Sequence, residues 1–288
     1  ALTNYKQTKD SKGEAAAISL IAHLTAQQGD VSRALELWQQ ALGLFEQIYD
    51  VHSKAGILHN MALAFAAQGQ VQKAIDLWQQ SLAIKQQIGD IPGKANTLSM
   101  LASVYARQGD TDKALELWND SLAVYEQLED VHGRATVLSM MAGEIATHGD
   151  SKRAFELWNK SLKLKEQIGD VQGRAATLSK MAKVTADKGD YVQARSWWEQ
   201  ALSLVEQVGD AFGRAATLAN LALLAQQQDN PSEAYKLNLE AATAFAALQA
   251  WPDLVTVLDN LGSTMADQSI KFYAQAYWLA LHVAVPIE

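Results

Sequence analysis

The sequence predicts an all-α solenoid of seven helix-turn-helix repeats, and two observations carry that prediction. The first is an internal period of 40 residues, in which a tryptophan and the alanine four positions before it return at every step. The second is composition, because 288 residues contain only 4 prolines and are rich in Ala, Leu and Gln, which favours helix. The tryptophan series is Trp38, Trp78, Trp118, Trp158, Trp198 and Trp278, with Asn238 in the sixth place.

Each repeat contains two helices separated by a short turn. In residues 91–130, apolar side chains follow a helical spacing, Gln108-Gly109-Asp110 interrupts it, and the spacing then resumes. Gly109 suits a left-handed residue after one helix, and Asp110 can cap the next. Most of the 17 glycines lie on the same lattice, which indicates that glycine serves turns. We expect first helices near 11–28, 51–68, 91–108, 131–148, 171–188, 211–228 and 252–267, and second helices near 31–48, 71–88, 111–128, 151–168, 191–208, 231–248 and 270–284.

The sequence predicts a single repeat domain over residues 1–288. Residues 1–10, ALTNYKQTKD, match ALGLFEQIYD at 41–50, so we interpret them as the remnant of an upstream second helix. An end of that kind leaves an apolar helix face without a neighbour, and end-to-end self-association is therefore expected. The repeats are placed near 11–50, 51–90, 91–130, 131–170, 171–210, 211–250 and 251–288.

Composition and charge exclude several classes of function. The chain has no cysteine, so thiolate metal sites and cysteine nucleophiles are excluded. Its net charge of −8 opposes nucleic-acid binding. No apolar run reaches the length of a membrane-spanning helix. We therefore expect a cytoplasmic protein with no cofactor, no nucleic-acid partner and no membrane partner.

The repeat resembles the tetratricopeptide repeat (TPR) family. The residues that carry the resemblance are Leu98, Leu101-Ala102, Tyr105, Gly109-Asp110, Ala114, Trp118 and Ser121-Leu122. The usual unit has 34 residues, so the 40-residue unit is similar to the long-repeat branch with the G-protein-regulating adaptors and kinesin light chains. The resemblance implies a right-handed superhelix whose first helices line a concave groove. It also implies a protein- or peptide-binding scaffold without catalytic activity.

The resemblance places the candidate binding residues on the groove face of the first helices. Asparagine amides there can pair with the backbone of an extended peptide, methionines offer an adaptable apolar floor, and two lysines favour an acidic partner. The lysine and asparagine clamp of chaperone-tail TPR proteins is absent. The predicted groove residues are His59, Asn60, Leu63, Asn96, Met100, Arg107, Met140, Lys180, Lys183, Asn220 and Asn260.

Two further series carry both a structural and a functional interpretation. The tryptophans share a helix stripe with the lattice alanines, which favours a core role over a stacking surface, with Trp197 partly exposed. A row of cations follows the lattice aspartates by four residues, as local ion pairs or as a basic rim for an acidic partner. These cations are Lys54, Lys94, Arg134, Arg174 and Arg214, after Asp50, Asp90, Asp130, Asp170 and Asp210.

The function predicted from the sequence is a scaffold that binds an extended peptide or a helix of a partner protein, and the groove lysines favour an acidic partner. The alternative is a ligand- or peptide-sensing module of a larger signalling protein, which could be bacterial. An enzyme is not expected, because the six histidines lack metal-ligand spacing and no nucleophile elbow or phosphate-binding loop occurs.

Overall fold

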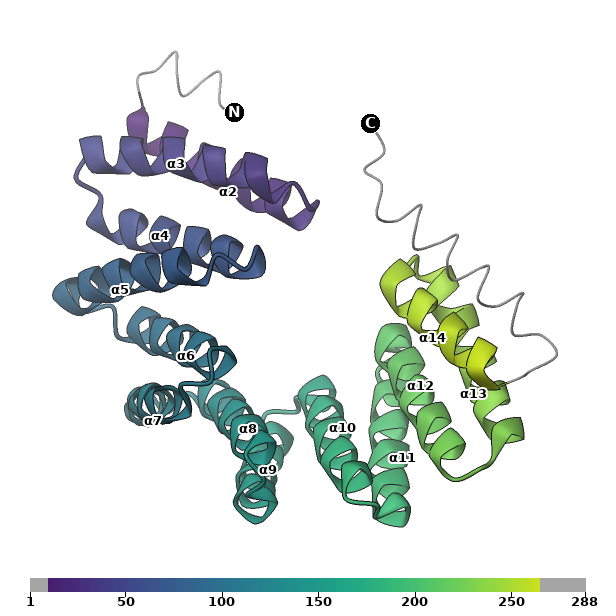
Figure 1. The fold of residues 1–288 in the computed structure, drawn as a ribbon. Helices are drawn as coiled ribbons and strands as arrows, with labels where there is room; N and C mark the ends of the chain where they lie inside the picture. Colours follow the sequence, from purple (N-terminus) through teal and green to yellow (C-terminus); the bar gives the residue numbers. More distant parts are fainter. Residues whose placement is uncertain (1–9, 265–288) are drawn as a thin grey trace. The chain divides into compact units, whose positions relative to one another are not determined.

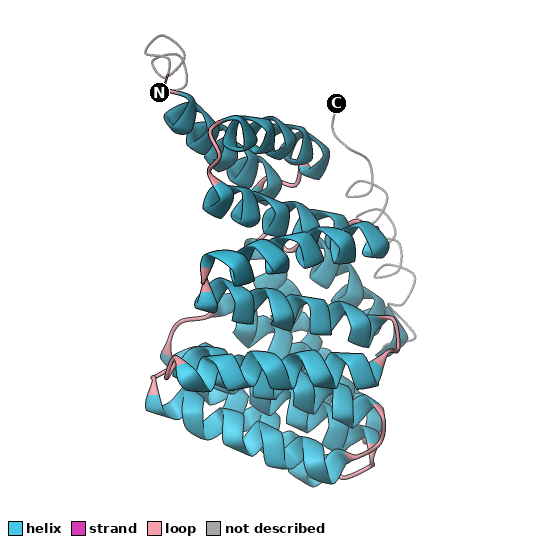
Figure 2. Cartoon of the chain, turned by 90° about the vertical axis from the view of Figure 1, so that its left-hand side faces the viewer, coloured by secondary structure: helices cyan, strands magenta, loops and turns pink. Residues whose placement is uncertain are grey.

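The structure is a computed structural model that describes residues 10–264. Every regular element in this range is an α-helix (Figure 2). The first helices of the repeats are α2 (Ser11–Gln27), α4 (Val51–Ala67), α6 (Ile91–Arg107), α8 (Val131–Thr147), α10 (Val171–Asp187), α12 (Ala211–Gln227) and α14 (Trp251–Thr264). The second helices are α3 (Val31–Gln47), α5 (Val71–Ile88), α7 (Thr111–Gln127), α9 (Ser151–Gln167), α11 (Tyr191–Gln207) and α13 (Pro231–Ala247).

The predicted all-α repeat fold is confirmed, and the helices begin within one residue of their expected positions. The second helix expected near 270–284 lies outside the described residues. The same holds for residues 1–9 of the predicted remnant, whereas Asp10 caps α2 by accepting a hydrogen bond from the Gly13 backbone N–H at 2.9 Å.

The helix boundaries follow from the two residues at each turn. Asp110 Oδ1 accepts a hydrogen bond from the backbone N–H of Lys113 at 3.2 Å, which satisfies an otherwise unpaired amide at the start of α7. Gly109 has a φ of 82°, the left-handed conformation that ends α6 without a side-chain clash. Tyr49 and Glu129 adopt the same conformation, with φ of 57° and 54°, so the turn geometry survives where glycine is missing.

A second set of lattice glycines has a different role from the predicted one. Gly93 and Gly173 lie inside the first turn of α6 and α10, and a Cβ atom there would collide with the capping carboxylate of Asp90 or Asp170. At Gly133 the collision would be with the ring of Tyr125. The prediction that glycine serves only turns is therefore wrong for this set, in which its small size permits close packing.

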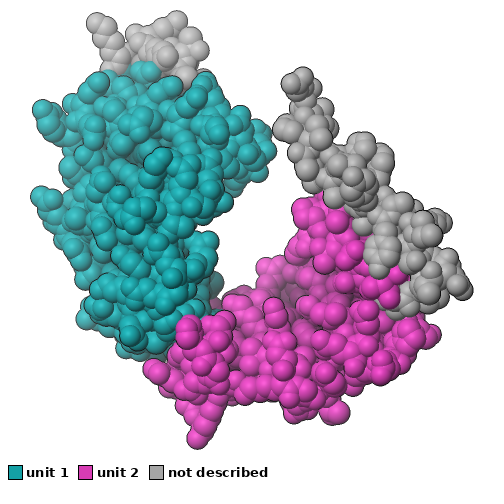
Figure 3. Space-filling model, viewed as in Figure 1, with its two compact units in different colours: residues 1–144 teal, residues 145–288 magenta. Residues whose placement is uncertain are grey.

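The chain divides into two compact units, residues 1–144 and 145–288, with the boundary inside α8 (Figure 3). Within the first unit, each helix from α2 to α7 packs against the next one along the chain (Figure 1). The same sequential packing joins α9 to α14 within the second unit. Contacts between neighbours in sequence are what a repeat array requires.

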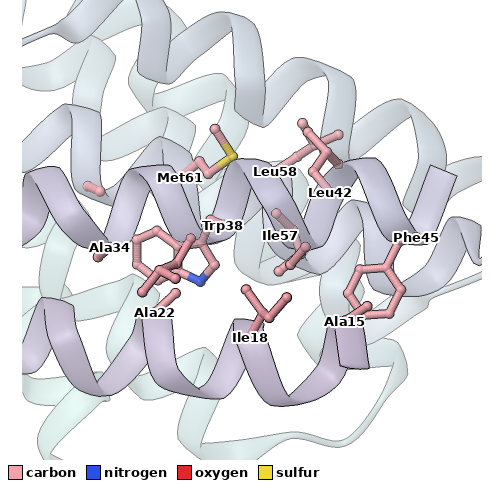
Figure 4. Packing of buried hydrophobic residues seen from close by; sticks show 13 residues of the cluster. Ala15, Ile18, Ala22, Ala34, Trp38, Leu42, Phe45, Ile57, Leu58 and Met61 are labelled. Carbon is pink, nitrogen blue, oxygen red and sulfur yellow. The ribbon is translucent and has the colours of Figure 1, made fainter. Parts of the chain in front are cut away.

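The lattice tryptophans are buried in the core, which confirms their structural interpretation. Trp38 is 3% exposed and lies beside Ala22 and Ala34, where the small side chains make room for the indole (Figure 4). Trp197 is partly exposed, as predicted. The other lattice tryptophans of the described chain are 1–4% exposed: Trp78, Trp118, Trp158 and Trp198.

Candidate peptide-binding groove

The candidate groove is built from one face of the first helices, and it is described separately for each unit. In the first unit, Asn60, Met100 and Met140 are half-buried and Leu63 is 41% exposed. In the second unit, Asn220 and Asn260 are half-buried, whereas Lys180 and Lys183 are exposed. Asn96 and Arg107 of α6 are also exposed. Most of the predicted groove residues are therefore accessible.

An open hollow of about 300 Å³ lies where α2, α3 and α4 meet. Two predicted groove residues, Asn60 and Leu63, lie together on its wall. Its nine lining residues are His23, Ala26 and Gln27 of α2, Val31 and Trp38 of α3, and Asn60, Leu63, Ala64 and Ala67 of α4. The hollow thus combines an apolar floor with polar groups at its edge.

His59 does not line the groove, and this part of the prediction is wrong. Its side chain is 8% exposed, because its face of α4 is turned toward the interior. The Nδ1 atom lies 3.3 Å from Thr97 Oγ1, and the ring packs edge-on against Trp78. Burial, with a smaller contribution from the nearby charge of Lys85, lowers the pKa of His59 to about 4.

Two buried lysines were not anticipated from the sequence. Lys85 is 6% exposed and its ammonium donates a hydrogen bond to Thr97 Oγ1 at 2.9 Å. Lys165 repeats this arrangement with Thr177 at 2.9 Å. Burial lowers the pKa of both lysines. The signal in the sequence is a lysine that recurs with a threonine twelve residues later, on the core stripe where other repeats carry Phe, Tyr or Val.

Met140 is held in place by two serine hydroxyls from α6. Ser99 Oγ lies 3.6 Å from the Met140 sulfur and Ser103 Oγ lies 3.8 Å from it. These contacts join the first helices of two consecutive repeats within the first unit. The methionine side chain therefore forms part of the packed wall of this face, with its exposed part available to a partner.

The second unit presents positive charge on the same face. Lys180 and Lys183 lie three residues apart on α10, and neither forms an ion pair with a carboxylate among the described residues. Desolvation by the surrounding protein lowers the pKa of Lys180, although its side chain is accessible. Lys165 lies near enough for the charge of Lys180 to contribute to its own lowered pKa. The exposed ammonium groups of Lys180 and Lys183 are suited to bind an anionic group.

The basic rim is paired, but not with the predicted aspartates. The carboxylates of these aspartates accept backbone N–H groups as helix caps, as Asp50 Oδ1 does from Ser53 at 3.0 Å. The cations instead contact a glutamate eight residues earlier, on the preceding second helix. The pairs are Lys54–Glu46 at 2.8 Å, Arg134–Glu126 at 3.9 Å, Arg174–Glu166 at 3.3 Å and Arg214–Glu206 at 3.1 Å, and Arg214 also contacts Glu240.

Lys94 is the exception among the rim cations. The residue eight positions before it is Gln86, which carries no charge, and Lys94 has no carboxylate partner within residues 10–264. The rim therefore consists of four cations already engaged in ion pairs and one that is not, which weakens the case for a continuous basic surface.

The described chain holds neither a metal-binding cluster nor a membrane-spanning helix. No group of three or more His, Asp or Glu side chains in residues 10–264 is arranged to hold a metal ion. None of the helices in this range has the length and apolar character that would let it cross a membrane.

Comparison with solved structures supports the fold. A signal transduction ATPase with numerous domains and a tetratricopeptide repeat sensor, from Pyrococcus horikoshii, shares 17% identity at a TM-score of 0.70, covering 95% of this chain and 42% of that one. A Rap protein complexed with Competence and Sporulation Factor shares 14% identity at a TM-score of 0.62, covering 88% and 75%. The TPR-like repeats of a kinesin light chain from Podospora anserina share 21% identity at a TM-score of 0.55, covering 67% and 95%.

Sequence comparison identifies the family. A search among curated proteins found no match. The sequence profile described as tetratricopeptide repeat matches residues 13–87, 93–167 and 173–247, and each match spans two successive helix pairs. These three matches cover more than half of the sequence and coincide with the helix pairs of the structure. The chain therefore belongs to the tetratricopeptide repeat family.

Proposed function

We propose that this protein is an interaction scaffold that binds an extended peptide segment of a partner protein along the groove face of its first helices. The observation that carries the proposal is the position of Asn60 on the wall of the apolar hollow in the first unit. Its amide makes no hydrogen bond with another described residue. A free amide beside an apolar recess offers one group for a peptide backbone and another for a side chain.

The second unit gives the proposed scaffold a preference for negatively charged peptides. Asn220 repeats the position of Asn60, and Lys180 and Lys183 lie one repeat earlier on the same face. An acidic side chain bound near these lysines would be attracted to two cations that lack a carboxylate partner in the described chain. The scaffold therefore favours a peptide with an acidic segment. The structure of a Rap protein complexed with Competence and Sporulation Factor supports a function in which this fold binds a partner.

The experiment is a selection of twelve-residue peptides displayed on phage, with the purified chain as bait. Selected peptides are then measured by calorimetry against the wild type and against the double variant Lys180→Glu, Lys183→Glu. Binding of acidic peptides should weaken strongly in the variant, and wild-type binding should weaken as salt screens the contact. Failure to select any peptide would contradict the proposal, and undiminished binding by the folded variant would remove the two lysines from it.

A sensing module of a larger signalling protein is the second candidate. It is favoured by the similarity to the TPR sensor protein from Pyrococcus horikoshii, of whose length the chain covers 42%. The two candidates differ in what binding does to the protein. A sensor must change its structure when the peptide binds, so the radius of gyration from X-ray scattering should shift with peptide, whereas that of a passive scaffold should not.

In either form the protein acts by binding, without catalysis and without a resident cofactor. We place it in the cytoplasm, because a chain without cysteine carries no disulfide that would call for an oxidising compartment. Fractionation of the producing cell, followed by detection of the chain in membrane, nucleic-acid and soluble fractions, tests this placement.

A further inference from the structure

The hollow in the first unit is lined in part by two alanines that later repeats replace with larger residues. Ala64 and Ala67 lie on its wall. The positions equivalent to Ala64 carry Val104, Glu144, Val184 and Leu224, and those equivalent to Ala67 carry Arg107, Thr147, Asp187 and Gln227. Val104 is 1% exposed and Leu224 is fully buried, so in those repeats the larger side chain is packed into the interior. The combination of two alanines occurs at the junction of the first two repeats alone.

We propose that this hollow, which we call the first-junction pocket, receives one uncharged apolar side chain of the bound peptide. This inference rests on the proposed function, because it concerns the same groove, and it adds the class of residue that the peptide must carry. The occupant is a side chain such as leucine, methionine or phenylalanine. The argument uses the size of the pocket, the chemistry of its walls and the polar groups at its rim.

Size selects a single side chain over a larger occupant. The pocket has a volume of about 300 Å³. An engineered apolar cavity of about 150 Å³ is sufficient to bind benzene, so the first-junction pocket accommodates any apolar side chain. Nine lining residues cannot provide the roughly 1,200 Å² of buried surface at the lower end of a stable interface between two folded chains, which disfavours a second copy as occupant.

The absence of charged lining residues favours an apolar side chain over a charged one. None of the nine lining residues is Asp, Glu, Lys or Arg, and the floor is formed by Val31, Trp38 and alanines. A carboxylate or ammonium group inserted here would lose its hydration without gaining an ionic partner. This contrasts with Lys180 and Lys183 in the second unit, which favour the opposite chemistry at the same lattice positions.

The rim provides groups for the backbone on either side of the anchored residue. Asn60 Oδ1 and Nδ2 are available for a peptide N–H and C=O, respectively. Across the pocket, Gln27 Nε2 lies 3.2 Å from His23 Nε2, which links two consecutive turns of α2. Polar groups on both sides of an apolar recess are the arrangement that holds an extended chain with one side chain inserted.

The test uses capped amino acids as probes, because they carry one side chain and no peptide sequence. N-acetyl-leucine-N-methylamide is titrated against the chain with methyl-labelled alanine and leucine, and N-acetyl-aspartate-N-methylamide is the matched probe. We expect the leucine probe alone to shift the methyl signals of Ala64, Ala67 and Leu63. Ala64→Val, which introduces the residue that Val104 and Val184 carry, should narrow the pocket and raise the dissociation constant by about tenfold or more.

A second variant separates loss of the pocket from loss of the fold. Leu63→Ser introduces the residue found at the equivalent Ser103. Because Leu63 is 41% exposed, the change removes part of the pocket wall without altering a buried residue. It should also weaken the leucine probe. If both folded variants bind the leucine probe as the wild type does, or if the shifts fall outside the pocket, the inference is wrong.

The peptide selection distinguishes failure of the inference from failure of the proposed function. Peptides selected on the wild type should share an apolar residue at one position, and that preference should disappear on the Ala64→Val chain. Peptides that bind both chains equally would refute the pocket and leave the scaffold proposal standing. If no peptide binds either chain, the scaffold proposal fails, and the capped-leucine titration alone decides whether the pocket exists as a binding site.

Discussion

At the scale of single residues, Gln70 interrupts the series of helix caps. It occupies the N-cap position of α5 but makes no side-chain hydrogen bond to the backbone there, whereas the equivalent Asp30 and Asp110 both do. Its side-chain oxygen instead accepts a hydrogen bond from Lys73 Nζ at 2.8 Å. One amide at the start of α5 therefore lacks the partner that its counterparts have.

Gln70→Asp should stabilise the protein by about 1 kcal/mol, because aspartate is among the best N-cap residues. Urea denaturation of both chains measures the difference. Gln68→Asp, two residues earlier and outside the cap position, is the matched control and should leave the midpoint within error. Equal stabilisation by the two variants would show that added negative charge, and not capping, is responsible.

The buried imidazole of His59 gives the stability a pH dependence. Because burial depresses its pKa from 6.5 to about 4, the folded protein keeps the ring neutral over a range in which the unfolded chain binds a proton. The free energy of unfolding should therefore fall as pH decreases from 6.5 toward 4. The contribution of this residue is at most about 3 kcal/mol, and it changes little below pH 4.

The pH dependence is measured by chemical denaturation between pH 7 and pH 4.5. His59→Ser, which introduces the residue at the equivalent Ser99, should remove part of the slope. Lys85→Met removes the nearby charge but not the burial, so it should reduce the slope only in part. Identical slopes for the wild type and His59→Ser would mean that the pKa of the imidazole is the same in the folded and unfolded states, which would contradict the burial argument.

At the scale of helices, the ion pairs connect the end of each second helix to the start of the next first helix. The pair between Arg174 and Glu166 bridges the turn from α9 to α10, and equivalents occur at other turns. At the turn from α5 to α6, Gln86 leaves Lys94 without this contact. The side chains involved are about one-third to two-thirds exposed, so each pair contributes modestly.

Gln86→Glu should complete the series and stabilise the chain by a few tenths of a kcal/mol to about 1 kcal/mol at low salt. The gain should shrink as salt is raised, because the charges face solvent. Gln87→Glu places the same charge one residue further along, on another side of α5, and serves as the control. A gain that does not depend on salt, or that both variants share, would contradict ion pairing with Lys94.

At the scale of the whole molecule, stability depends on contacts between consecutive repeats. Trp118 is 3% exposed in α7 and occupies the same lattice position as Trp38. In an array of this kind, each repeat is stabilised chiefly by its neighbours along the chain. Damage to one interface should therefore be felt first in the adjacent helices.

Trp118→Ala should destabilise the protein by on the order of 3–5 kcal/mol, because it removes a large buried side chain. Hydrogen exchange should show the greatest loss of protection in α6 and α7. Trp197→Ala, in which the altered residue is only partly buried, should cost less. An unchanged melting temperature together with loss of peptide binding would instead assign Trp118 to a binding surface.

The sequence was sufficient to predict where the helices lie, but not which side chains of each helix are buried and which are exposed. The 40-residue period places Trp118, Gly109 and Asp110 correctly, since the lattice tryptophan falls on the buried stripe of a helix, a left-handed glycine follows the end of a helix and a capping aspartate precedes the start of the next. His59 was assigned to the wrong face because the rotation of one repeat against the next decides which residues are covered.

The ion pairs and the pocket show why other features escaped the sequence. Asp50 was expected to pair with Lys54, but its carboxylate is already used by the Ser53 amide, and the turn brings Glu46 within reach. Ala64 and Ala67 line the hollow although alanine is common throughout the chain. These alanines leave space that a larger side chain would occupy. That space is apparent only from the packing of α2, α3 and α4.

The two alanines bear on how a repetitive surface can hold a ligand in one position. A peptide that contacted only the residues shared by all repeats would make equivalent contacts when shifted by one repeat. Its binding at the different repeats would then be nearly equal in free energy. A recess beside an alanine pair that occurs in one repeat of the sequence removes this translational degeneracy, because a side chain inserted beside Ala64 fixes the position of the residues that follow it. In an array this regular, the departure from the repeat is what gives a bound chain a defined starting point.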